Sequence, residues 1–159
     1  MSKAERIVFI LWGHHCHEAA ATIFVTALRE AGLRVKVVGL SGQRIAGVYG
    51  LALTPDIMLD QALRLAQRAI CVVSPCDAAS LRRFGNDPRL GDFLQQAHAN
   101  HAQFVMGEAD PIWLASIGIV FVPEKSNARI VYPKDVGIMH YAQTLAHALV
   151  AVDRKLRRD

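Results

Sequence analysis

The sequence predicts an α/β protein, a three-layer sandwich in which helices cover both faces of a mostly parallel central sheet. Short apolar runs alternate along the chain with amphipathic segments of helical length, which is the pattern of parallel strands joined by crossover helices. The 159 residues and a hydrophobic content of 52% allow one sizeable core. That length fits a single domain over residues 1–159 better than two domains.

The first strand–helix–strand unit has the clearest pattern. Residues 6–12, RIVFILW, form a nearly continuous run of β-branched and aromatic residues, as expected for a strand buried on both faces. Residues 18–31 carry apolar side chains on one helical face, and Gly32 is a suitable helix stop. Residues 33–40 then predict a second strand, which completes a right-handed βαβ unit with parallel strands.

The remaining chain continues this alternation. Residues 41–56 are rich in glycine and alternate weakly, which predicts a pair of short strands or a small hairpin. Further helices are expected over residues 56–66, 88–102, 110–117 and 136–156. Further strands are expected over residues 69–74, 103–106, 119–123 and 128–133.

Composition and charge narrow the classes of function. The net charge of +4 is modest, and the basic run RKLRR at 154–158 predicts a solvated tail rather than a nucleic-acid-binding patch. The apolar run over 7–12 is too short for a signal peptide, and no stretch reaches the about 18 apolar residues that span a bilayer. Three irregularly spaced cysteines argue against a disulfide framework. We therefore expect a soluble, cytoplasmic protein that binds neither nucleic acid nor membrane.

Polar side chains gather in three loops that are expected to meet at one edge of the sheet. In open parallel sheets, ligands bind beyond the carboxyl ends of the strands. The loops that leave such ends span residues 13–18, 75–79 and 107–110. Their chemistry-bearing side chains are His14, His15, Cys16, His17, Glu18, Cys76, Asp77, Glu108 and Asp110. We expect side chains from all three loops to line one cavity.

The stretches VFIL, LREAG, LRVKVVGL, LTPDIMLDQA and AICVVSP follow one another over residues 5–77. This order resembles the ThiJ/PfpI family of the class I glutamine amidotransferase-like superfamily. In addition, FVMGEADPIWLA at 104–115 resembles the nucleophile-elbow segment of that family. The resemblance implies a flavodoxin-like three-layer sandwich and association into homo-oligomers.

The chain departs from the family pattern where the chemistry is expected. The family usually places a strained cysteine at the elbow, and the matching position here is Gly107. The family's first loop usually supplies a glutamate that hydrogen-bonds this cysteine, and Glu18 is the candidate. The family's PGG, a source of oxyanion-type donors, is replaced by PCD at 75–77, and its later histidine has no counterpart in 121–127. The classical cysteine mechanism is therefore expected to be absent or relocated.

Two hypotheses concern the pocket. In the first, the protein lacks the classical nucleophile, requires no cofactor and binds a small ligand in the ancestral pocket. The ligand-binding candidates are His15, His17, Asp77 and Gly107. In the second, the protein is a hydrolase or glyoxalase-like enzyme in which a loop histidine lowers the pKa of a displaced thiol nucleophile. The catalytic candidates are Cys76, Glu18 and Glu108, although Cys76 could also be a small apolar filler and Glu108 could complement a helix dipole.

A third hypothesis concerns the five-residue run His14–Glu18, HHCHE. Neutral imidazole and thiolate are good ligands for zinc, copper or nickel, and His15, Cys16 and His17 are the candidate ligands. Adjacent residues cannot all point at one ion, so the remaining ligands would come from another loop. The alternative is a polar loop with solvated histidines, since the spacing matches no standard zinc motif.

Overall fold

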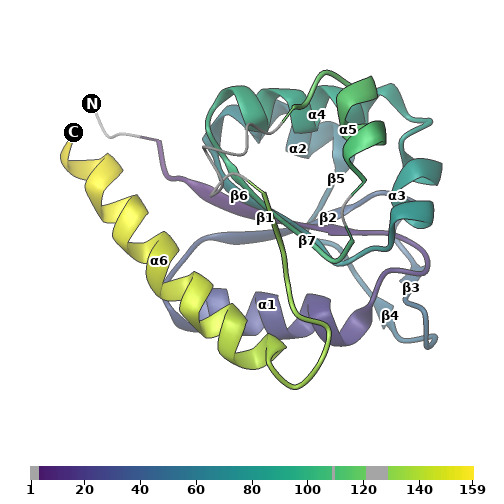
Figure 1. Cartoon of the computed structure of the whole chain (residues 1–159), viewed down its shortest axis with the longest axis horizontal. Coiled ribbons are helices and arrows are strands. Elements are labelled where there is room, and N and C mark those ends of the chain that lie inside the picture. Colours follow the sequence, from purple (N-terminus) through teal and green to yellow (C-terminus); the bar gives the residue numbers. More distant parts are fainter. Residues whose placement is uncertain (1–3, 109, 121–128) are drawn as a thin grey trace.

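The computed structural model describes residues 4–108, 110–120 and 129–159. In this part of the chain, six strands form one sheet in the order β5-β2-β1-β6-β7-β8, and each neighbouring pair runs parallel (Figure 1). The strands are β1 Ile7–Trp12, β2 Val35–Gly39, β5 Ile57–Met58, β6 Ala69–Ser74, β7 Gln103–Met106 and β8 Arg129–Val131. The predicted α/β class and parallel sheet are confirmed.

The side chains of the central strand β1 enter two different cores. Successive side chains of a strand point to opposite faces. Val8, Ile10 and Trp12 pack in the core under α1 (Glu18–Glu30) and α6 (Ile138–Arg158). The intervening residues of the strand pack in a second core on the other face. Both faces are covered, so every residue of β1 is buried.

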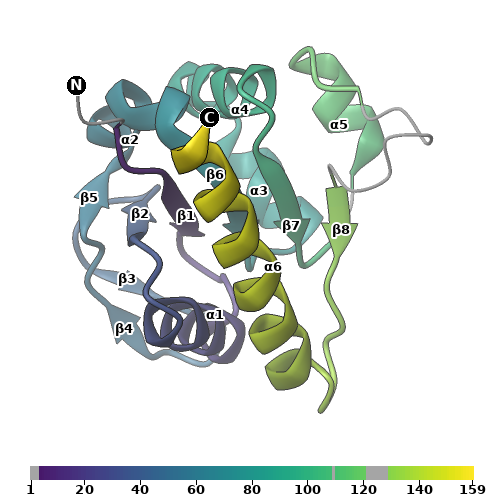
Figure 2. The ribbon, with the colours of Figure 1, turned by 90° about the vertical axis from the view of Figure 1, so that its left-hand side faces the viewer.

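Helices form the two outer layers. Helices α1 and α6 lie side by side on one face (Figure 2). The other face is covered by α2 Leu59–Leu65, the 3-10 helix η1 Ala66–Arg68, α4 Pro88–Ala99 and α5 Pro111–Ser116 (Figure 1). The described helices include none that is long and apolar enough to cross a membrane.

Two local features differ from the sequence-based expectation. Residues 75–79 were expected to be a loop, but Asp77 caps a short helix, α3 (Ala78–Phe84), which is too brief to show a helical repeat. The helix expected from residue 56 begins at Leu59 because the two preceding residues form β5. The predicted hairpin is confirmed as the antiparallel pair β3 (Ile45–Ala46) and β4 (Ala52–Leu53).

The last strand predictions have mixed outcomes. The strand expected over 128–133 is confirmed as β8. Of the strand expected over 119–123, the first two residues are not in a strand, and the rest lie outside the described residues. The missing family histidine was argued from 121–127, which also lies outside them. The parallel arrangement brings the ends of β1, β6 and β7 to one edge of the sheet, called here the carboxyl edge.

Candidate functional site at the carboxyl edge

A disulfide links two of the loops that were expected to meet. Cys16 in the loop after β1 and Cys76 in the loop after β6 are bonded, and their Cα atoms lie 4.3 Å apart. Both residues are buried. The cysteine pattern argued against a disulfide framework, but one disulfide is present because β1 and β6 are neighbours and bring residues 60 positions apart together. Cys71 is free and buried, and burial raises the pKa of its thiol.

Backbone hydrogen bonds hold the histidine-rich loop in place. The N–H of His15 donates to Ala46 O at 3.2 Å, and the N–H of His17 donates to Pro75 O at 2.8 Å. His15 has a φ of 66°, a left-handed conformation that is uncommon outside glycine. The side chains of His14 and His15 are exposed, and that of His17 is half-buried. The loop is thus fixed by its main chain, with two imidazoles facing solvent.

Glu18 anchors the β3–β4 hairpin. Its buried carboxylate accepts hydrogen bonds from the N–H groups of Tyr49 at 2.9 Å and Leu51 at 3.1 Å. It also packs on Gly47, where a Cβ would overlap the carboxylate. Burial alone raises the pKa of Glu18, but backbone N–H donors outweigh it, so the pKa lies below the ordinary value. This predicted catalytic residue is an ionised group fully engaged with the hairpin.

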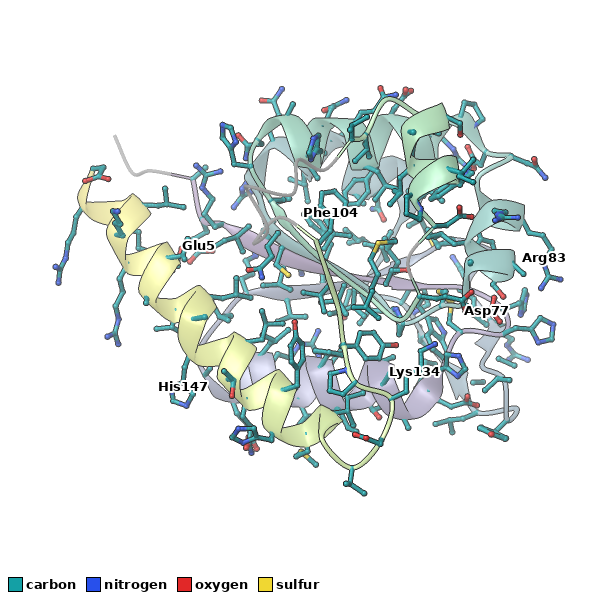
Figure 3. The ribbon with its side chains drawn as sticks, viewed as in Figure 1. Glu5, Asp77, Arg83, Phe104, Lys134 and His147 are labelled. Atoms are coloured by element: carbon teal, nitrogen blue, oxygen red, sulfur yellow. A yellow bond between two sulfur atoms is a disulfide. The ribbon has the colours of Figure 1, made fainter. Side chains whose placement is uncertain are left out.

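Asp77 is the N-cap of α3 rather than a side chain pointing into a pocket. Its carboxylate accepts from the N–H of Ser80 at 2.7 Å. This bond lowers the pKa of Asp77 against the effect of burial, and the nearby charges of His17 and Arg83 lower it further. Asp77 and Arg83 lie at the same end of the molecule (Figure 3). The capping bond accounts for the aspartate at this position.

The elbow position is closed by Tyr132. A Cβ at Gly107 would lie 2.6 Å from the Tyr132 hydroxyl and 3.3 Å from the carbonyl oxygen of Cys76. Tyr132 is buried, and burial raises the pKa of its hydroxyl to about 12, which keeps it neutral. The space that a nucleophilic side chain at residue 107 would occupy is therefore filled by a neighbouring phenol. Sequence reasoning missed Tyr132 because it follows the region where the family resemblance holds.

The two acidic residues of the loop after β7 differ in burial and in their partners. Glu108 is exposed, and its carboxylate lies 4.0 Å from the Nζ of Lys134. Asp110 is buried, binds the Nε of Arg82 and caps α5 through the N–H of Trp113 at 3.1 Å. The bond with Arg82 is the main reason that the pKa of Asp110 is lowered. Arg82 was not a candidate in the sequence, whereas an aspartate before a helix-starting proline is a signal that could have identified the cap.

The metal hypothesis can be compared with this geometry. In the described part of the chain, no three His, Cys, Asp or Glu side chains are arranged to hold a metal ion. A thiolate at Cys16 is needed for the proposed ligand set, but its sulfur is bonded to Cys76. In this oxidised state only His15 and His17 of the three proposed ligands keep a donor atom.

The comparisons with known proteins give matches among solved structures. Neither the protein-family models nor the curated protein sequences include a match. DJ-1 of Toxoplasma gondii, in its oxidised form, matches with a TM-score of 0.70 at 14% identity, covering 92% of this chain and 96% of its own. DJ-1beta of Drosophila melanogaster matches with a TM-score of 0.70 at 19% identity, covering 92% and 91%. A putative protease I of Bacteroides thetaiotaomicron matches with a TM-score of 0.68 at 13% identity, covering 91% and 99%. The chain therefore has the DJ-1/ThiJ/PfpI fold, and the resemblance in sequence is confirmed at that level.

Proposed function

We propose that this chain is a divergent DJ-1/ThiJ/PfpI-type protein that does not use an elbow cysteine and whose carboxyl edge responds to redox state. The observation that carries the proposal is the Cys16–Cys76 bond, which joins the loops after β1 and β6. The carbonyl of Cys76 also lies beside Gly107, where the family resemblance places the nucleophile. The sulfur chemistry of the site is thus moved from one thiol at the elbow to a pair of cysteines.

The other groups of the edge support this proposal because they already have structural partners. Glu18 holds the hairpin, Asp77 caps α3, and Tyr132 fills the space beside Gly107. A hydrolase or glyoxalase-like reaction through Cys76 requires the bond to Cys16 to be reduced first, since a disulfide sulfur is not a thiolate nucleophile. That enzyme remains the alternative for the reduced state.

The redox step is ordinary thiol–disulfide exchange. A thiolate of an external dithiol attacks one sulfur of the Cys16–Cys76 bond, which breaks and leaves the other sulfur as a thiolate that takes up a proton. The second thiol of the dithiol then displaces the bound cysteine as a thiol, and the reductant leaves as its own disulfide. Because both cysteines are buried, exchange requires local opening of the loop after β1.

Thiol trapping under native conditions tests the proposal. The protein is equilibrated with graded ratios of reduced and oxidised dithiothreitol, quenched with an alkylating reagent and weighed by mass spectrometry. We expect two labels to appear together on Cys16 and Cys76 and to disappear on reoxidation, while buried Cys71 stays unlabelled. A pair that stays oxidised in strongly reducing native buffer contradicts the proposal and shows a structural cross-link instead.

A small-ligand site at the same edge is the second candidate. The hydroxyl of Ser74, at the carboxyl end of β6, is buried and has no hydrogen-bond partner among the described residues. Its carbonyl accepts from the N–H of Gly107 at 2.8 Å, so Ser74 lies beside the residue that the family resemblance aligns with the elbow. An orphaned buried hydroxyl is unfavourable unless a water or a ligand reaches it. A thermal-shift screen of small hydroxy and carbonyl compounds, repeated with Ser74→Ala, tests this: hits that persist in the variant contradict the assignment.

Self-association is a further part of the proposal. The β3–β4 hairpin exposes Tyr49 by 91% and Leu51 by 52% of their surface. Neighbouring exposed apolar side chains are typical of interaction surfaces. We expect the protein to form a homo-oligomer. Tyr49→Ser is expected to weaken this association, whereas Ile112→Ser, at another exposed apolar position, is expected to leave it unchanged. Light scattering after gel filtration measures the oligomeric state of both variants.

Cytoplasmic localisation stays a prediction. Disulfides of cytosolic proteins are usually transient, which agrees with a Cys16–Cys76 pair that opens and closes with redox state.

A further inference from the structure

A concave surface lies at the amino edge of the sheet, opposite the site described above. It has a volume of about 440 Å³ and forms where the residues before β1, η1, the end of α4 and the end of α6 meet. That volume lies in the usual range for small-molecule sites, roughly 300–1,000 Å³. Its charged and amide side chains are Arg6, Gln67, Arg68, Asn100, Arg157 and Asp159.

The three arginines of this cleft are held in position by the protein. Arg6 donates from Nη1 to Gln67 O at 3.3 Å, and Arg68 donates from Nε to Glu5 O at 2.8 Å. Arg157 donates from Nε to Asp153 at 2.9 Å. A guanidinium has five N–H donors, and each of these bonds uses one. The guanidinium groups are therefore oriented while further donors remain for a ligand.

The charges of the cleft favour an anion. Three cationic side chains from distant parts of the sequence converge on it, and Asp159 is the carboxylate among its lining residues. Asp153, outside that lining, partly balances Arg157. Like charges gathered around one cleft repel each other, and a multivalent anion removes that repulsion. The basic run at 154–158 was expected to be a solvated tail, but Arg157 contributes to this cleft.

We infer that the amino-edge cleft binds a small molecule through a phosphoryl or diphosphate group. Arginine is suited to this role because its planar fork of donors matches the oxygen atoms of phosphate, often with two parallel bonds. Asn100 lines the same cleft, and its side-chain amide donates to Gln67 O, the carbonyl that also accepts from Arg6. This inference does not depend on the function proposed for the carboxyl edge.

Calorimetric titration with inorganic pyrophosphate, at constant ionic strength, tests the inference. We expect saturable binding by the wild type and at least about tenfold weaker binding by Arg68→Gln, since a charge-assisted hydrogen bond is lost. Arg44→Gln removes the same charge from an exposed loop outside the cleft and is expected to bind as the wild type does. Asp159→Asn removes the opposing carboxylate and is expected to bind more tightly.

Three results would overturn the inference. The first is the absence of saturable binding up to millimolar pyrophosphate. The second is equal weakening by Arg68→Gln and Arg44→Gln, which indicates general charge screening, and the third is given by the variant Arg157→Gln. Arg68 also bonds the backbone at Glu5, so its replacement could disturb the fold. Arg157→Gln, on the exposed end of α6, provides the second variant, and unchanged binding there also contradicts the inference.

Discussion

The two edges of the sheet use their charged side chains in opposite ways. At the carboxyl edge, Glu18, Asp77 and Asp110 are each bonded to backbone N–H groups of a hairpin or helix, so their charge stabilises the chain itself. At the amino edge, guanidinium groups converge on a cleft with donors to spare. Glu5 and Asp77 mark these two ends of the molecule (Figure 3). Charged residues near the edge of a sheet where ligands are expected are therefore evidence of ligand binding only when some of their donor or acceptor atoms are not already hydrogen-bonded within the protein.

The largest expected effect is that of opening the Cys16–Cys76 bond. The bond closes a loop of 60 residues, so reduction is expected to lower the free energy of unfolding by about 2–4 kcal/mol. The N–H of Val48, bonded to Cys16 O, is expected to exchange faster in the reduced protein, while the amino edge keeps its protection. Urea unfolding and hydrogen exchange of both forms measure this, with Cys71→Ser as a control that keeps the bond. Equal stability of the two forms would show that the bond does not order this edge.

Replacement of the hairpin anchor, Glu18→Gln, should have the next largest effect. The variant keeps the size of the side chain but removes the charge that accepts two backbone N–H groups, so we expect a loss of about 2 kcal/mol at pH 7. The folded pKa of Glu18 is lowered, so its contribution is complete above the unfolded value, near 4.3, and is lost as pH falls through the folded pKa. Urea unfolding at pH 7 and pH 3 should show the difference from wild type shrinking in acid. A difference independent of pH would contradict the role of the charge.

A side chain at residue 107 should also destabilise the fold. Gly107→Ala places a methyl group against the Tyr132 hydroxyl, and overpacking of this kind costs about 1–3 kcal/mol. Tyr132→Phe removes that hydroxyl, so Gly107→Ala should destabilise the Tyr132→Phe protein less than it destabilises the wild type. The double variant is therefore expected to lose less free energy of unfolding than the sum of the two single losses. A double-mutant cycle by urea unfolding gives the coupling. Strict additivity would show that the phenol does not close this position.

The fold was predictable because the evidence for it is local and repeated. The buried run Ile7–Trp12 and the amphipathic segment after it carry their periodicity in a few consecutive residues. The meeting of the loops after β1, β6 and β7 also followed from parallel strands alone, whereas a cavity lined by their side chains stays a prediction. The Cys16–Cys76 pairing could not be derived, because it depends on which strands are neighbours. The closure of Gly107 depends on Tyr132, which reaches it only through the packing of the edge strand.

The smallest expected effect separates two acids, Asp77 and Glu108, that the sequence predicts at the same edge of the sheet. Asp77→Ala removes the cap of α3 and should lower the free energy of unfolding by about 1 kcal/mol at pH 7. Glu108→Gln should change it by less than about 0.5 kcal/mol, because its pairing with Lys134 is at 4.0 Å between exposed groups and water screens it. The folded pKa of Asp77 is lowered, so its contribution should fade as pH drops below its unfolded value, near 3.9, and through the folded value. Parallel urea titrations of both variants at pH 7 and pH 2.5 measure the contrast. If Glu108→Gln lowers the free energy of unfolding as much as Asp77→Ala does, the exposed carboxylate of Glu108 also stabilises the chain through bonds within the protein.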